Sequence, residues 1–321
     1  MNIHIFEKLH QQELITDSAL EIIREKEKKK LFSLHWELKT ILYLGIVLLT
    51  TGLGILVYKN IDTIGHQVIV AIIAIGCALC YSYCLKKSSG FSRYKNANTK
   101  IWPDYLLLLG CLLLLIFIAY IQFQYNVFGT RLGMATFIPM IILFISAYYF
   151  DHLGVLSMAI TNLAAWAGIT VTPLHVLQDN DFNSINIIYT GVALGAVLLA
   201  IAHVSVLKNF KAHFAFTYKN FGTHGLLISC LAGLFTINYL WFLLLAAICA
   251  YLFIMATREK SFYFIVITLL YAYIGISYMV IELLSNIGDI GSVYLGLFYF
   301  IVSGILLIRV MMSFNKQFKR I

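Results

Sequence analysis

The sequence predicts an all-α membrane protein, a polytopic transmembrane helical bundle of about ten spans. Hydrophobic residues make up 61% of its 321 residues, charged residues make up only 12%, and the mean hydropathy is +0.86. Soluble domains usually contain about 45–50% apolar and about 25% charged residues. Apolar windows of membrane-spanning length recur along the chain, and basic residues gather in alternate connections between them. Lipid is therefore the expected solvent for most of this chain.

Ten apolar windows come close to the length of about 20 residues that a helix needs to cross a hydrocarbon core of about 30 Å. In the first half of the chain they lie at 39–58, 66–85, 104–125, 133–150 and 153–171. In the second half they lie at 185–206, 221–237, 239–256, 262–284 and 290–312. Two pairs are separated only weakly, at Asp151-His152 and at Asn238-Tyr239, which leaves eight or nine spans as alternative counts.

The distribution of Lys and Arg predicts the orientation of the bundle. With the N-terminus inside, 21 of the 23 basic residues fall on the cytoplasmic side, and only Lys59 and Arg131 fall outside. Basic residues near span ends are retained on the cytoplasmic side, whereas acidic residues contribute little. Merging either weakly separated pair would reverse the side of every later connection. The charge bias thus supports ten spans and places both termini in the cytoplasm.

Three regions are expected: a cytoplasmic helical arm at 1–36, a ten-span domain at 37–313 and a basic cytoplasmic tail at 314–321. In the arm, Ile5, Phe6 and Leu9 indicate a first short helix, and Ser18 with Glu21 forms a capping box that opens a second. We expect a helical hairpin. Two interpretations stay open: the arm docks a protein partner or anionic lipid headgroups, or it is a solvated linker whose lysines only enforce topology.

The N-terminal third also carries sequence features of a known family. They are the segment Glu13-Leu14-Ile15-Thr16-Asp17-Ser18-Ala19-Leu20, a glycine-rich first span, and its end at Val57-Tyr58-Lys59-Asn60. Over roughly the first 90 residues the chain resembles the bacterial predicted-membrane-protein family catalogued as domain of unknown function 2157. The family's usual tryptophan after this Asn is replaced by Ile61. The resemblance implies a multi-pass protein of the bacterial cytoplasmic (inner) membrane and supplies no catalytic residues.

Several partner and cofactor classes are disfavoured. The net charge of +8 would suit nucleic acid, but the basic residues lie in short connections where topology explains them, so no nucleic-acid partner is expected. All six cysteines lie inside apolar windows, where disulfides are not expected. Cys77, Cys80 and Cys84 share one helix face, where they could hold copper(I) or zinc or act as small packing residues. We favour packing and predict no cofactor or metal.

Ionisable groups deep in a bilayer are costly and often functional, but Asp, Glu, Lys and Arg are missing near every window's midpoint. Glu282 could form an outward-facing cation or proton site with Arg131 or Lys59, or could extend to the interface. His203 and His224 are expected at the inner ends of the sixth and seventh spans, near His213 in their connection. They could form a pH-sensitive or metal-binding cluster, or could be ordinary interfacial histidines.

The remaining candidates for a functional site are polar groups that could line a cavity. They are Asn162, Thr50, Thr161, Tyr271 and Glu282. Such groups more often hydrogen-bond neighbouring helices. Gly191 and Gly195 form a small-xxx-small face that predicts close packing of the sixth span.

The sequence is compatible with three functions. The first is a transporter-like bundle for a small solute, because ten spans with both ends inside fit two five-span halves of opposite orientation, although no internal repeat is visible. The second is a non-catalytic scaffold or sensor that docks a partner through residues 1–36. An intramembrane enzyme ranks last because the polar groups match no recognisable mechanism. A water-accessible cavity that reaches the middle of the bilayer and is lined by Asn162, Thr50 and the face of Tyr271 and Tyr273 would favour transport. A tightly packed bundle would exclude it.

Overall fold

A computed structural model describes residues 10, 15–17, 34–59, 65–88, 90–95, 101–129, 131–171, 184–287 and 290–319. The chain divides into two compact units, Met1–Gly65 and His66–Ile321. In the first unit the long described helix is α3 (Leu34–Lys59). The second unit contains α5 (His66–Lys87), α6 (Ile101–Tyr125), α7 (Leu132–Phe150), α8 (Leu153–Val171), α10 (Ile185–Leu207), a short 3₁₀ helix η1 (Ala212–Phe214), α11 (Ala215–Thr236), α12 (Trp241–Arg258), α13 (Phe262–Ser285) and α14 (Ile290–Lys319).

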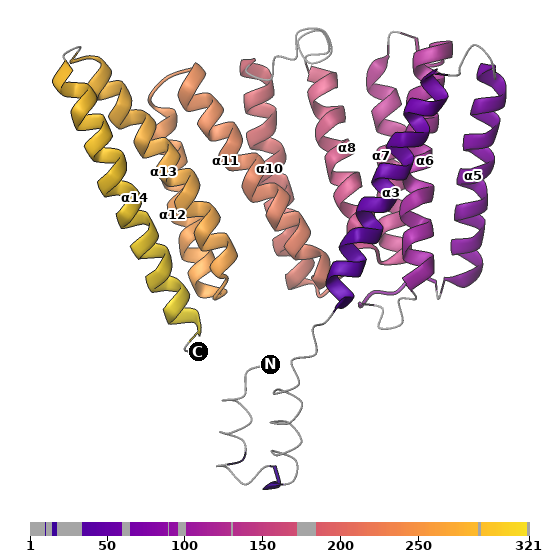
Figure 1. Cartoon of the computed structure of the whole chain (residues 1–321), viewed down its shortest axis with the longest axis horizontal. Helices are drawn as coiled ribbons and strands as arrows, with labels where there is room; N and C mark the ends of the chain where they lie inside the picture. Colours follow the sequence, from indigo (N-terminus) through magenta and orange to yellow (C-terminus); the bar gives the residue numbers. More distant parts are fainter. Residues whose placement is uncertain are drawn as a thin grey trace. The chain divides into compact units, whose positions relative to one another are not determined.

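The all-helical fold class is confirmed in the described part of the chain. Each of the ten expected windows coincides with one long helix (Figure 1). Eight of these helices are long and apolar enough to cross a membrane. The other two are α3, whose apolar stretch is the shorter segment Thr40–Leu56, and α11, which holds Lys219 in its first half. The hairpin expected at the N-terminus lies mostly outside the described residues.

Both weakly predicted breaks between helices are confirmed. α7 ends at Phe150, and Asp151 follows it in a left-handed conformation (φ 60°) that turns the chain, while its N–H bonds to the Ala147 carbonyl. His152 then caps α8, because its Nδ1 accepts a hydrogen bond from the Val155 N–H at 3.1 Å. The second break lies between α11 and α12, where the Asn238 side chain accepts a hydrogen bond from the Leu240 N–H. Local capping thus makes two helices of each long apolar stretch.

Helices that follow one another in sequence pack side by side in the second unit. The closest pairs are α5 with α6, α7 with α8, α10 with α11, and α12 with α13. α8 also contacts α10 and α11, and so joins the α5–α8 part of the unit to the α10–α14 part. α14 packs on α13 at the far end of the array (Figure 1).

The α10–α11 pair is the most intimate contact of the bundle, and glycines make it possible. A Cβ atom placed on Gly195 would lie 2.7 Å from the backbone nitrogen of Leu226. One placed on Gly222 would lie 3.0 Å from the Gly195 carbonyl oxygen. Gly191 is similarly close to Ser229. The small-xxx-small face of Gly191 and Gly195 therefore packs closely against a neighbouring helix, as predicted.

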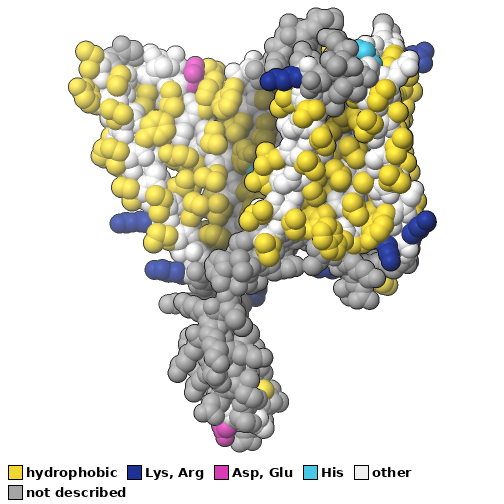
Figure 2. Space-filling model, turned by 45° about the vertical axis from the view of Figure 1, so that its right-hand side comes forward, with side chains coloured by type: hydrophobic (Ala, Val, Ile, Leu, Met, Phe, Trp, Pro, Cys, Tyr) yellow, Lys and Arg dark blue, Asp and Glu magenta, His cyan; other side chains and the backbone are white. Residues whose placement is uncertain are grey.

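The sides of the helices are apolar. Figure 2 shows hydrophobic side chains covering the flanks of the described helices and charged side chains near their ends. Large residues such as Leu79, Leu243 and Tyr251 are more than half exposed. Such a surface would aggregate in water, but it matches the hydrocarbon of a bilayer. The structure therefore agrees with a membrane protein.

Candidate functional site

A cavity of about 730 Å³ lies between α8, α10 and α11, and we call it the central cavity. Small residues on all three helices leave the space, among them Ala164 and Gly168 of α8, Gly191 of α10 and Gly225 of α11. Its lining reaches Thr161, the ninth of 19 residues in α8. It also extends to Ile169 and Ile187, near the helix ends that were predicted to face outside. The central cavity therefore joins the middle of the bundle to its predicted outer half.

His224 is the most polar side chain in the lining of the central cavity. Its Nδ1 lies 3.0 Å from the hydroxyl oxygen of Tyr271 in α13. If Tyr271 donates this hydrogen bond, Nε2 carries the imidazole proton and can donate to a bound molecule. Thr161 and Thr190 also line the cavity, and each donates its own hydroxyl proton to a carbonyl of its own helix. Their oxygens can still accept a hydrogen bond. The cavity thus combines an apolar wall with a few polar groups.

The expected position of His224 at an inner helix end was wrong. α11 begins at Ala215, six residues before the predicted start at 221, so His224 is the tenth of its 22 residues. The prediction treated Lys219 as a loop residue because of its charge. In the structure Lys219 is inside α11, where it pairs with Glu259 and lies 4.4 Å from the ring centroid of Phe264. Because Glu259 neutralises its charge, Lys219 can lie inside the helix. α11 therefore begins earlier than predicted, and His224 lies near the middle of the helix.

The five candidates from the sequence do not gather at one place. Thr161 lines the central cavity, and Tyr271 reaches it only through His224. Thr50 belongs to α3 in the other unit, where its hydroxyl donates to carbonyls of its own helix. Asn162 follows Thr161 in α8 but does not line the described cavity.

Glu282 lies near the end of α13, away from the residues that line the central cavity. It accepts a 2.9 Å hydrogen bond from the Tyr239 hydroxyl, and this hydrogen bond, together with the negative charge of the carboxylate, raises the pKa of that phenol. Among the described residues, no ion pair links Glu282 with Arg131. The carboxylate thus contacts the α11–α12 connection.

The cysteine and histidine groups are also dispersed. Cys77 and Cys84 direct their thiols at carbonyl oxygens of α6, and Cys80 packs against Gly110 of the same helix. His213 and His224 have different partners, Asp151 and Tyr271 respectively. Within the described ranges, no group of three or more His, Cys, Asp or Glu residues could hold a metal ion.

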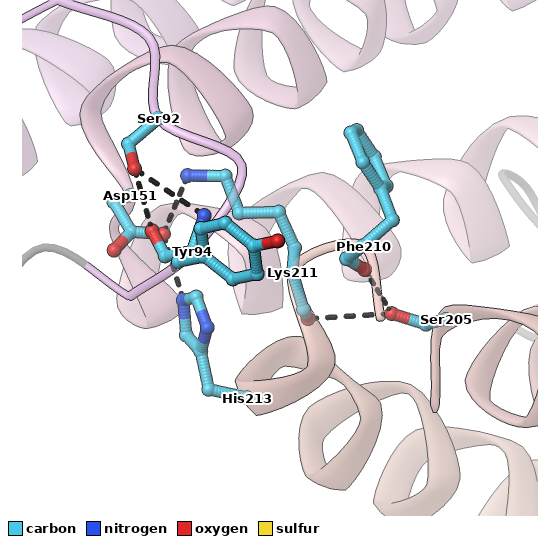
Figure 3. A network of polar contacts seen from close by, with 7 residues as sticks. All are labelled: Ser92, Tyr94, Asp151, Ser205, Phe210, Lys211 and His213. Atoms are coloured by element: carbon cyan, nitrogen blue, oxygen red, sulfur yellow. Dashed lines mark hydrogen bonds and ion pairs between the residues drawn. The ribbon is translucent and has the colours of Figure 1, made fainter. Parts of the chain in front are cut away.

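A second polar site was not found from the sequence, and we call it the Asp151 network. Asp151 Oδ1 lies 2.6 Å from the Lys211 ammonium and 2.7 Å from His213 Nε2. The Lys211 side chain is 0% exposed and that of Asp151 is 3% exposed. Figure 3 shows Lys211 and His213 converging on Asp151, with Ser92 and Tyr94 beside them. A buried ion pair of this kind requires close geometry and further hydrogen bonds to offset its desolvation.

The Asp151 network ties three connections of the bundle together. The Lys211 N–H bonds to the Arg93 carbonyl at 3.0 Å, and the Lys211 ammonium lies 5.5 Å from the ring centroids of Phe91 and Phe214. Ser205 donates to the Phe210 carbonyl at 2.6 Å, which holds the turn after α10. All three connections were predicted to be cytoplasmic. Asp151 was noted only as a helix break, because its partner lies 60 residues away and no local pattern indicates it.

A comparison with protein families adds one finding. Residues 7–156 match the family model for predicted membrane proteins, DUF2157. The family resemblance is therefore confirmed. The DUF2157 match extends beyond the first 90 residues, from the N-terminal arm into α8, and it includes Asp151 but neither Lys211 nor most of the central cavity. No curated protein and no solved structure matches the chain.

Proposed function

We propose that this membrane protein is a transporter-like bundle that takes a small amphipathic solute into the central cavity. The cavity of about 730 Å³ that reaches the middle of the bundle is the observation that supports this most directly. Binding sites for small molecules usually measure about 300–1,000 Å³ and are mostly apolar with a few placed polar groups. A bundle with a tightly packed centre would have excluded transport.

The chemistry of the lining indicates the class of solute. Apolar and small side chains dominate it, and His224, Ser229, Thr161 and Thr190 supply the polar groups. The described lining holds no Asp, Glu, Lys or Arg, so it offers little to offset the desolvation of an ion. A neutral solute with an apolar body and one or two hydrogen-bonding groups fits best.

The experiment that tests this proposal measures whether water reaches Thr161. The variant Thr161→Cys is exposed, in intact cells, to a membrane-impermeant thiol reagent, which reacts only with hydrated thiols. We expect Thr161→Cys to be labelled. The control is Ile141→Cys, which lies at the tenth of 19 residues in α7, outside the central cavity, and should stay unlabelled. The unmodified protein reports the background from its six cysteines.

A second substitution links this labelling to the central cavity. Gly225 lines the cavity, and a Cβ placed on it meets no atom within 4 Å. Gly225→Leu should therefore place its side chain in the cavity and protect Thr161→Cys from the reagent. Gly304→Leu is the matched control, because Gly304 of α14 also has open space but lies outside the cavity. If Thr161→Cys is not labelled, or if Gly225→Leu gives no protection, the proposal is wrong.

The location in the bacterial cytoplasmic membrane, with both termini inside, is part of the same proposal. The family match and the partition of 21 of 23 basic residues support it. The alternative function, a scaffold or sensor that docks a partner through residues 1–36, rests on the charged composition of that arm. It is tested by deleting the arm and crosslinking partners, and unchanged partners would exclude it.

A further inference from the structure

A second hollow of about 810 Å³ lies between α10 and α11 on one side and α12 with the start of α13 on the other. We call it the inner groove, because its polar end lies at the connections predicted to be cytoplasmic. Ala196 and Ala200 of α10 face Ala247 of α12 across it, and all three are exposed. Their short side chains leave an apolar channel between the helices. The inner groove and the central cavity are lined by different residues of α10, so this inference does not rest on the proposed function.

One end of the inner groove carries opposite charges. Lys219 of α11 forms an ion pair with Glu259, which follows the last residue of α12. The Lys219 side chain is only 9% exposed, whereas that of Glu259 is 50% exposed. His203 and Ser261 line the same end. The Lys219 ammonium has three protons, so it can bind an additional acceptor while it keeps Glu259.

The other end of the inner groove is apolar. Its lining includes Leu199, Leu226 and Ile248 in addition to the alanines. From Glu259 to Ala247 the lining follows α12 for a distance of about 18 Å, at about 1.5 Å per residue. That length is close to the thickness of one bilayer leaflet, about 15 Å. An acyl chain can therefore lie along the groove while its headgroup stays at the charged end.

We propose that the inner groove binds a phospholipid whose headgroup carries both a phosphate and a primary amine. The phosphate lies beside Lys219 and His203, the ammonium beside Glu259, and one acyl chain runs along the alanines. A phosphoglycerol headgroup places no cation near the Glu259 carboxylate. A phosphocholine headgroup has no N–H to donate. A soluble zwitterion matches the charges but leaves the apolar length of the groove empty.

The test measures phospholipid binding to the full-length purified protein by native mass spectrometry. Phosphatidylethanolamine, phosphatidylglycerol and phosphatidylcholine of the same chain length are the three probes. We expect phosphatidylethanolamine to bind about tenfold more tightly than the other two, which corresponds to one charge-assisted hydrogen bond. Equal binding of the three lipids would overturn the proposal.

Two variants assign this binding to the inner groove. Glu259→Gln should abolish the preference for the ethanolamine lipid, whereas Arg258→Gln, the exposed neighbouring residue outside the groove, should retain it. Ala247→Phe should fill the groove and reduce binding of phosphatidylethanolamine about tenfold. Ala246→Phe, equally exposed but outside the lining, should leave binding unchanged. If the preference survives Glu259→Gln, or if Ala247→Phe leaves phosphatidylethanolamine binding unchanged, the lipid binds to another surface and the assignment is wrong.

Discussion

At the scale of single residues, the main finding is a salt bridge buried between the connections that follow α7 and α10. Asp151 ends one helix, and its carboxylate holds both the Lys211 ammonium and the His213 ring. The two ionised groups have almost no exposed surface. Removing one partner of such a pair costs about 3–5 kcal/mol, because the other charge is left buried and unpaired. The Asp151 network should therefore be a sensitive point of the folded state.

We expect Asp151→Asn to lower the free energy of unfolding by about 3 kcal/mol. Asparagine tolerates the left-handed backbone at this position. The lost stability therefore comes from removal of the negative charge and not from a change in the turn. Denaturation in mixed detergent micelles, followed by circular dichroism, measures the change. Glu282→Gln, which alters a half-buried carboxylate that accepts a hydrogen bond from the Tyr239 hydroxyl, is the control and should change stability by less than about 1 kcal/mol.

Adding Lys211→Met to Asp151→Asn should recover part of the lost stability. The double variant no longer buries an unpaired ammonium, and methionine retains much of the packing against Phe91 and Phe214. A double variant that is less stable than Asp151→Asn alone would show that the ammonium has another partner.

At the scale of helices, the sequence predicted well which helices exist and in which order they follow. It missed a helix boundary that depends on contacts between residues far apart in the sequence. The breaks at Asp151-His152 and Asn238-Tyr239 were found because capping residues interrupt an apolar run. The start of α11 was wrong because the pairing of Lys219 with Glu259 spans 40 residues. His224 was misplaced for the same reason. Hydropathy locates apolar stretches, but it does not identify charges that tertiary contacts neutralise.

The packing of α10 on α11 gives a prediction at this scale. Gly195→Ala should destabilise the protein by about 1–3 kcal/mol, because the new Cβ meets the Leu226 backbone, which cannot move aside without separating the helices. Gly225→Ala in the same helix pair should be neutral or stabilising by up to about 1 kcal/mol, because space is free there and alanine favours the helix. Thermal denaturation of both purified variants measures the difference, and equal melting temperatures would contradict the close contact.

At the scale of the whole molecule, composition and charge were enough to predict a multi-helix membrane protein. Eight apolar helices and the family match agree with that prediction. The cavities were not predictable, because they arise where small residues of three or four helices happen to face each other. Only Thr161 of the five candidate residues lines the central cavity. Polar character alone does not say which way a side chain faces or which helix lies beside it.

The orientation can be tested with two introduced cysteines in described connections. Val127→Cys lies between α6 and α7, which we expect outside, and Lys208→Cys follows α10, which we expect inside. A membrane-impermeant thiol reagent should label Val127→Cys in intact cells, and should label Lys208→Cys only after permeabilisation. The reverse pattern would place the N-terminus outside, and labelling of both in intact cells would mean that the number of spans between them is even and not three.

The Asp151 network also bears on how the protein is made. Only two residues connect α7 to α8, so the two helices must enter the membrane as one hairpin. Synthesis proceeds from the N-terminus, and Asp151 leaves the ribosome 60 residues before Lys211. During that interval neither Lys211 nor His213 has been made, so we expect the carboxylate to stay hydrated. Lys211 follows α10, and α10 packs on α8, so the salt bridge can close only when the α7–α8 hairpin and α10 lie together.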